Sequence, residues 1–181
     1  VKILNLIKMK NIVLFSFLST FSFAQVTEKI DTLSIEDYPM ETYHLPDIMN
    51  EISTLEYEKS DKKTASFWGL NDSGNQPELY RFNAKNGEII NTVRISNAPN
   101  IDWEEMSTDD NRIYFADFGN NRGNRKDLAI YFIDKKQVDF SKPYQEVKAQ
   151  KIEFFYPEQT NFESTNIRTN FDAEAFFVYN L

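Results

Sequence analysis

Acidic residues recur beside strand-like segments of this chain, at spacings that would let them share one oxygen-rich site. The stretch "IDWEEMSTDDNRIYFADFGNN", residues 101–121, sets carboxylates among the aromatic and branched side chains that favour strands. Six acids in such positions are the candidate metal ligands: Asp72, Asp102, Glu104, Asp117, Asp172 and Glu174. Clustered carboxylates repel one another unless a cation lies between them, and hard oxygen ligands suit Ca²⁺. Calcium is therefore the expected cofactor.

Solvated turns and strand ends are the other interpretation of these acids. Asp72 and Asp117 precede glycine-containing turns, in which an Asp side chain commonly bonds its own backbone and glycine supplies a positive φ. The other four acids have the alternative of flanking strands at a solvated end. No DxDxDG calcium loop is present. Three nearby amides would add carbonyl ligands to a metal site: Asn71, Asn75 and Asn120.

Other chemistries find little support in the sequence. The chain has no cysteine and one histidine, His44, which lies outside the strand-rich region. No serine has G-x-S-x-G neighbours, and no P-loop or G-x-G-x-x-G is present. An enzyme here would be a metal-dependent hydrolase with Glu104 or Glu174 as general base. The basic loop with Arg122, Arg125 and Lys126 is either a phosphate site or a solvated surface.

Charge and the N-terminus indicate an exported protein without a nucleic-acid partner. The formal net charge is −8, whereas nucleic-acid-binding proteins usually show a basic face. Lys8 and Lys10 precede the apolar run 12–24, "IVLFSFLSTFSFA", which is too short to span a bilayer and typical of a signal peptide. We expect cleavage after Ala24, no transmembrane span in the mature chain, and a periplasmic, outer-surface or secreted location. An uncleaved N-terminal anchor is the alternative.

The elements expected after a polar lead-in, residues 25–50, are short strands separated by turns, which predicts an all-β fold. Asn86-Gly87 is a strong hairpin signal, and both tryptophans, Trp68 and Trp103, are expected to pack in the core. The expected strands are 64–70, 78–82, 88–95, 104–107, 112–118, 128–134, 151–157 and 173–180.

A repeat underlies these strands. "EISTL" at 51, "DWEEM" at 102 and "DAEAF" at 172 each open with an acid, and Asp72 matches Asp117 in a second aligned turn. A period of about 40–50 residues with four strands is typical of β-propeller blades. We expect one blade at 51–95, a second at 102–157 with a long insertion at 135–150, and the start of a third at Asp172. Residues 51–181 would then form β-propeller-like, four-stranded antiparallel blades, about two and a fraction of them, as in a truncated propeller.

The same motifs carry a family resemblance. The run "FWGLNDSGNQPELYRF", followed by "DWEE", "ADFGNN" and "DAEAFFVYN", resembles secreted bacterial β-propeller proteins of undefined function, over about residues 65–180. More distantly it is similar to esterase-like phytase, SdiA-regulated and gluconolactonase-type propellers. Two positions depart from the pattern: Phe171 stands for a His, and Glu105 for an Asp.

Three functional hypotheses follow. The first is an exported propeller-type protein that binds an unknown ligand or protein partner and is stabilised by calcium. The second is a metal-dependent phosphoesterase or lactonase of the sort that the resemblance implies. The third is a truncated, non-functional remnant of either. The first is the leading hypothesis.

Overall fold

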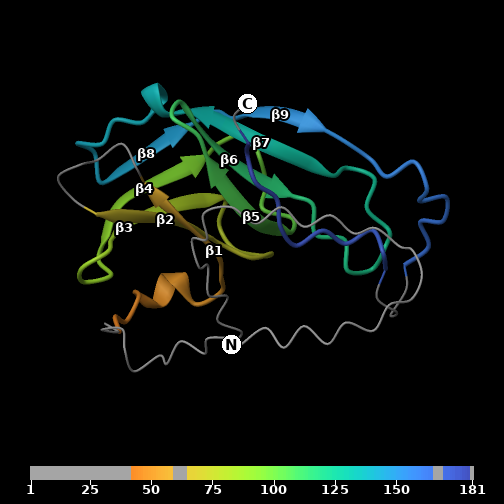
Figure 1. Cartoon of the computed structure of the whole chain (residues 1–181), viewed down its shortest axis with the longest axis horizontal. Coiled ribbons are helices and arrows are strands. Elements are labelled where there is room, and N and C mark those ends of the chain that lie inside the picture. The colour runs from red at the N-terminus through yellow and green to blue at the C-terminus, as the bar shows by residue number, and fades with distance from the viewer. Residues whose placement is uncertain (1–41, 59–64, 165–168, 180–181) are drawn as a thin grey trace, which may run out of the picture. The chain divides into compact units, whose positions relative to one another are not determined.

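Two packed β-sheets make up the described part of the protein. The computed structural model describes residues 42–58, 65–164 and 169–179, and Figure 1 shows the two sheets layered against each other. Within these ranges the structure has no α-helix, which confirms the all-β prediction, and none of their helices is long and apolar enough to cross a membrane. The predicted signal peptide, residues 1–24, lies outside the described residues.

The first sheet is an antiparallel meander with one added strand. Its order is β1-β2-β3-β4-β8, and β8 runs parallel to β4. A short 3-10 helix, η2 (Asp47–Met49), precedes the sheet and is the orange coil in Figure 1. The strands are β1 (Ile52–Glu58), β2 (Ser66–Asn71), β3 (Glu78–Asn83), β4 (Ile89–Ile95) and β8 (Tyr144–Val147).

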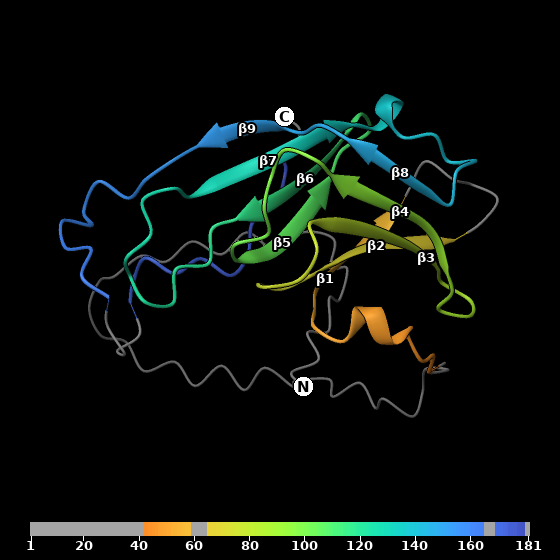
Figure 2. The same cartoon turned by 180° about the vertical axis from the view of Figure 1, so that it is seen from behind.

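The second sheet is a meander of four antiparallel strands in the order β5-β6-β7-β9. Its connection from β7 to β9 contains the 3-10 helix η3 (Lys135–Gln137) and strand β8. Seen from behind in Figure 2, β5 lies close to the first sheet and β9 on the opposite edge. The strands are β5 (Trp103–Thr108), β6 (Arg112–Asp117), β7 (Ala129–Asp134) and β9 (Gln150–Glu153).

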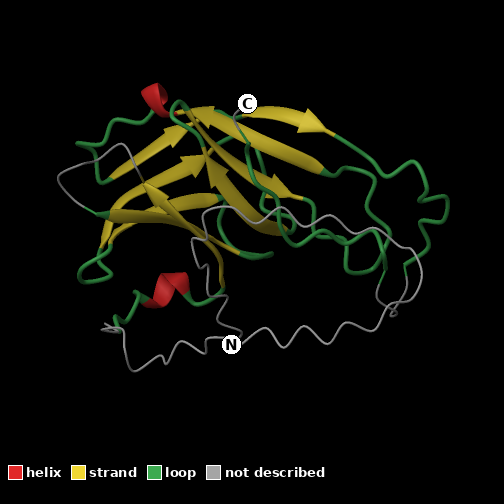
Figure 3. Ribbon diagram, in the orientation of Figure 1, coloured by secondary structure: helices red, strands yellow, loops and turns green. Residues whose placement is uncertain are grey.

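The predicted insertion, residues 135–150, therefore belongs to both sheets. It was expected as a loop of the second blade, but its strand β8 extends the first sheet by one strand. Asn91 Nδ2 donates to the carbonyl of Lys142 at 2.7 Å, and Asn97 and Ala149 exchange two bonds at 2.8 and 2.9 Å. Figure 3 shows β8 as a yellow arrow between long loops. The insertion thus joins one sheet to the other.

The two meanders repeat one structural plan. We call β1–β4 repeat 1 and β5, β6, β7 and β9 repeat 2. Both first strands have the same irregularity, between Ile52 and Thr54 in repeat 1 and between Trp103 and Glu105 in repeat 2. The cross-strand registers align Leu55, Gly69 and Tyr80 in repeat 1 and Met106, Phe115 and Tyr131 in repeat 2. The offset of 51 (106 − 55 and 131 − 80) that the sequence indicated is thereby present in the structure.

One predicted match is shifted by a residue. The ladders place Asn71 opposite Ile52 and Asp117 opposite Trp103, so Asp117 is the counterpart of Asn71 and not of Asp72. The offset in the second strands is 46 (117 − 71), whereas the turn motifs suggested 45. Asp72 therefore has no equivalent acid in repeat 2.

The hydrophobic core lies between the two repeats. Repeat 1 contributes Trp68, Leu70 and Val93, and repeat 2 contributes Phe115 and other side chains of the facing surface. Trp68 and Trp103 are fully buried, as the sequence predicted, and Trp103 contacts Phe115 with ring centroids 4.6 Å apart. Strands β2 and β3 are buried along nearly their whole length, whereas β1 and β4 alternate between buried and more exposed residues.

Residues 172–179 lie alongside β5 and form no assigned strand, although a strand was predicted at 173–180. Val178 N donates to Ser107 Oγ at 3.2 Å, and Thr108 N donates to Glu56 Oε1 at 3.1 Å. These two bonds are equivalent in the repeat. The donor Val178 lies 70 residues after the donor Thr108, and the acceptor Ser107 lies 51 residues after the acceptor Glu56. In Figures 1 and 2 this dark-blue segment passes beside the second sheet.

Candidate metal centre

Three of the predicted ligands meet at one end of the sheets. Asp72 follows the last residue of β2, Asp102 precedes β5, and Glu104 is the second residue of β5. One carboxylate oxygen from each lies within 4.8 Å of the others. Asp72 and Asp102 are partly buried, while Glu104 is only 6% exposed. Two chain segments thus deliver three carboxylates to one small volume.

Asp172 and Glu174 border this cluster. Asp172 Oδ1 accepts the backbone N–H of Asn120 at 2.5 Å, which ties the last described segment to the turn after β6. Glu174 is exposed and shares a side-chain hydrogen bond with Glu104. Five of the six predicted ligands therefore gather at one end, from three separate segments.

The electrostatics of the cluster show its unbalanced charge. Burial, followed by the charges of Glu174, Asp72, Asp102 and Asp172, raises the pKa of Glu104 to about 8. Burial and the Asp72 charge also raise the pKa of Asp102, although Arg125 opposes them. A carboxyl group with a pKa near neutrality is held where its charge is poorly compensated by the protein.

Asp117 does not join the cluster. Its side chain is 1% exposed, pairs with Arg125 Nη1 at 2.8 Å, and accepts the backbone N–H of Asp102 at 3.1 Å. Burial raises the pKa of Asp117, and the neighbouring Arg125 partly offsets that rise. Asp117 therefore acts as a structural support for the Asp102 backbone.

Arg125 is correspondingly engaged in the structure. Besides Asp117 it pairs with Asp127 at 3.1 Å and donates to the carbonyl of Gly119 at 3.0 Å. The phosphate interpretation of the basic loop loses its central residue, because this guanidinium already has acidic and carbonyl partners.

Two positions outside the six predicted ligands shape the site. Asn100 Nδ2 donates to the carbonyls of Asn71 and Asp72 at 3.0 and 2.9 Å, and its Oδ1 accepts the Trp103 N–H at 3.1 Å. Asn100 thereby links the end of β2 to the start of β5. An Asn three residues before a strand gives a weak sequence signal, since the same pattern occurs in many turns.

Gly119 is the second such position. A Cβ atom there would overlap the carboxylate oxygens of Asp102 and Glu104. Its φ is not among the positive values, which occur at Gly74, Gly87 and Gly123. The expected reason for this glycine, a positive φ, is therefore wrong, and close approach of the two carboxylates explains it.

The three amides proposed as extra ligands have different surroundings. Asn120 is occupied, because its Oδ1 accepts the Arg125 N–H at 2.9 Å and its Nδ2 donates to the Phe171 carbonyl at 3.0 Å. Asn75 Nδ2 donates to Glu51 Oε2 at 2.6 Å. Asn71 Oδ1 is buried without a hydrogen-bond partner in the described part of the chain.

Asp72 also bonds its own turn, but not in the manner of an Asx turn, which joins the side chain to the N–H two residues on. Its Oδ1 accepts the N–H of the next residue, Ser73, and the same carboxylate faces the other acids. The only histidine, His44, is exposed, and its backbone lies against Gly87 in the β3–β4 hairpin. No hydrolytic triad forms around it in the described residues.

A set of oxygen ligands without nitrogen or sulfur suits Ca²⁺. Asp72, Asp102 and Glu104 would supply the first ligands, and Asp172 and Glu174 lie at the rim. Comparisons of the chain with family models, with curated proteins and with solved structures found no match.

Proposed function

We propose that this protein is an exported, β-propeller-type binding protein whose acidic cluster holds a calcium ion. The observation that carries the proposal is the approach of Asp72, Asp102 and Glu104 to within 4.8 Å, with Glu104 almost completely buried. A divalent cation would offset this repulsion and would join β2, β5 and the 172–179 segment.

The propeller interpretation rests on the repeat. Two four-stranded meanders share the same irregularity in the first strand, and equivalent hydrogen bonds join Glu56 to Thr108 and Ser107 to Val178. Successive first strands related in this way would gather around a common axis, with their acid-bearing ends on one side. Export rests on the apolar segment 12–24 and its flanking lysines.

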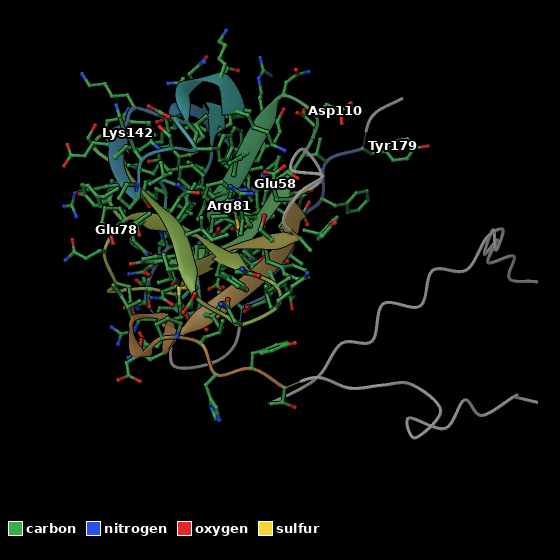
Figure 4. All side chains as sticks on the ribbon, turned by 90° about the vertical axis from the view of Figure 1, so that its left-hand side faces the viewer. Glu58, Glu78, Arg81, Asp110, Lys142 and Tyr179 are labelled. Atoms are coloured by element: carbon green, nitrogen blue, oxygen red, sulfur yellow. The ribbon has the colours of Figure 1, made fainter. Side chains whose placement is uncertain are left out.

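Thermal unfolding with increasing calcium tests the metal site. A ligand that binds the folded state raises the melting temperature with concentration, and we expect a rise at millimolar calcium that exceeds the rise with magnesium. Asp102→Asn and Glu104→Gln should each remove the response. Asp110→Asn, an exposed acid away from the cluster (Figure 4), should keep it. An unchanged melting temperature of the folded parent protein in calcium would contradict the proposal.

A metal-dependent phosphoesterase or lactonase is the second candidate function. It is favoured by one observation: a Glu104 pKa of about 8 places this carboxyl close to the value that general acid–base catalysis at neutral pH requires. Assays with aryl phosphates and simple lactones, with and without calcium, separate the two functions. Turnover that Glu104→Gln removes would favour the enzyme, whereas calcium-dependent stability without turnover would favour the binding protein.

A further inference from the structure

The outward face of repeat 1 has the composition of an interface. This face lies on the side of repeat 1 that is turned away from repeat 2. Cross-strand registers relate its residues to those of repeat 2 that are buried under repeat 1. The residues on this face of repeat 1 are Leu55, Phe67, Gly69, Tyr80 and Phe82; their counterparts in repeat 2 are Met106, Ile113, Phe115, Tyr131 and Ile133. The counterparts are buried under a sheet. On the face of repeat 1, Gly69, Tyr80 and Phe82 are buried, whereas Leu55 is exposed.

The outward face is only partly covered by its own chain. The lead-in packs Met49 close to Gly69 and accepts a hydrogen bond from Asn71 at the Ile48 carbonyl. Leu55 nevertheless remains 55% exposed and Tyr57 45% exposed. A largely apolar pocket of about 220 Å³ remains beside Leu55, between the lead-in and the side chains of β2 and β3. This combination leaves a hydrophobic surface on β1 that faces solvent.

A second exposed apolar surface lies on the 172–179 segment. This segment packs Phe176 against Phe118 of repeat 2, with ring centroids 6.0 Å apart. The alternate residues Phe177 and Tyr179 face outward, 80% and 73% exposed, and Figure 4 shows Tyr179 projecting from the body of the protein. Two aromatic side chains therefore stand where a further first strand would lie beside this segment.

We propose that the outward face of repeat 1 binds the 172–179 segment of a second copy of this chain, head to tail. The internal junctions supply the reason for choosing this partner. At each of them, a side chain at the Glu56 position contacts the next first strand at its Thr108 position. Phe177 occupies the Glu56 position of the third segment, and Tyr57 occupies the Thr108 position of repeat 1. The same rule places Phe177 of one copy against Tyr57 of the next.

This contact joins two different surfaces, so it is heterologous, and every chain keeps one free surface of each kind until a ring closes. The contacting side chains, Tyr57 and Phe177, are not members of the acidic cluster, although the 172–179 segment also carries Asp172 and Glu174 at the rim of that cluster. The contact would cover aromatic and aliphatic surface that is otherwise exposed to water.

Mixing two variants tests the head-to-tail geometry. Light scattering after size exclusion should show that the parent chain associates as its concentration rises. Leu55→Asp removes one surface and Phe177→Asp the other, so each variant should be monomeric by itself. A mixture of the two should form a dimer of one chain of each kind, because each retains the surface that the other lacks. Phe155→Asp, an exposed aromatic that follows β9 in repeat 2, should associate as the parent does.

Crosslinking gives a second readout that does not depend on disruptive charges. The chain has no cysteine, so Tyr57→Cys and Phe177→Cys introduce single thiols. Oxidising a mixture of these two variants should yield the mixed dimer in large excess over a control mixture of Tyr57→Cys and Phe155→Cys. A parent chain that stays monomeric at every concentration would overturn the proposal. So would association that survives both aspartate variants, or a mixed dimer no more abundant than in the control.

Discussion

The two ends of the first strands differ in what surrounds a buried carboxylate: a cationic partner at one end and other acids at the other. At the far end of β1, Glu58 is fully buried and is bonded to Lys135 Nζ at 3.2 Å and Trp68 Nε1 at 2.7 Å. Figure 4 shows Glu58 inside the molecule. At the near end, Glu104 is buried against four other acids. Arg125 is the cation that opposes the rise in the Asp102 pKa, and its guanidinium already pairs with Asp117.

This difference separates structure from function within one pair of sheets. The Glu58 end is a closed ion pair whose members come from both repeats, so its bonds hold the sheets together. The Glu104 end has excess negative charge that the described side chains do not neutralise, and it requires either protons or an external cation. Perturbed carboxyl groups of this kind mark candidate functional sites.

The largest effect is expected from opening the closed end. Lys135→Met removes a cationic partner of Glu58 and should lower the free energy of unfolding by about 3 kcal/mol, because the buried carboxylate loses this ion pair. Urea unfolding measures this loss. Adding Glu58→Gln to Lys135→Met should restore part of the stability. Equal stability of Lys135→Met and the parent would show that the pair does not join the repeats.

The acidic end should respond to pH in the opposite direction from an ion pair. The Glu104 carboxyl has a pKa of about 8 in the folded state and 4.5 unfolded, so the folded state binds its proton more tightly. Without calcium, the free energy of unfolding should therefore fall as pH rises from 4.5 to 8.

Glu104→Gln should flatten this slope. At pH 8 it should stabilise the metal-free protein by at least about 1.4 kcal/mol, the value of one pKa unit. Denaturant unfolding at several pH values, in a chelator, measures the difference. A parent protein whose stability rises across this pH window would contradict the electrostatic description of the cluster.

Asn100 tests the support between β2 and β5. Asn100→Ala removes its bonds to the Asn71 and Asp72 carbonyls and to the Trp103 N–H, and should cost about 1 kcal/mol in stability. It should also weaken calcium binding, because Asp72 and Asp102 lose their common support. Asn124→Ala, a change at an exposed Asn on the loop between β6 and β7, serves as the comparison. Identical calcium affinities of Asn100→Ala and the parent would show that Asn100 does not position the ligands.

Among these variants, Gly119→Ala should have the smallest effect on stability and the largest effect on calcium affinity. Its added Cβ meets the ends of the Asp102 and Glu104 side chains, which can move aside when no cation holds them. We expect a stability change below about 1 kcal/mol at pH 5 and a fall in calcium affinity of at least tenfold, about 1.4 kcal/mol in binding free energy. Isothermal titration measures the affinity. Gly74→Ala, strained by its positive φ but distant from any other atom, should leave the affinity unchanged.

The sequence predicted the repeat well where strands are regular. The offset of 51 between Tyr80 and Tyr131 is present in the ladders, because alternation of core residues fixes which face each strand presents. It failed by one residue at Asp72 and Asp117. The ladders pair Asn71 with Ile52 and Asp117 with Trp103, whereas the turn motifs had matched the two acids with each other. Pairing across a sheet depends on contacts between strands, so the turn sequences alone did not predict the different positions of these two acids.

The sequence predicted most of the acids of the candidate site but not the residues that support them. Five of the six proposed acids gather together, since acids that flank equivalent strands come to the same end of the sheets. The roles of Asn100 and Gly119 depend on distances between segments that are remote in sequence. Strand β8 also escaped prediction, because four residues pairing with a strand some fifty positions earlier leave no local pattern.

That added strand has a consequence for how the molecule comes apart. β8 emerges from one sheet and is hydrogen-bonded into the other, and Val138, Val147 and Ala149 from its segment enter the shared core. Neither sheet can melt without pulling this segment out of its neighbour. The interlacing makes unfolding cooperative: denaturant should produce a single transition, and the amide protons of β4 and β7 should exchange with solvent at similar rates.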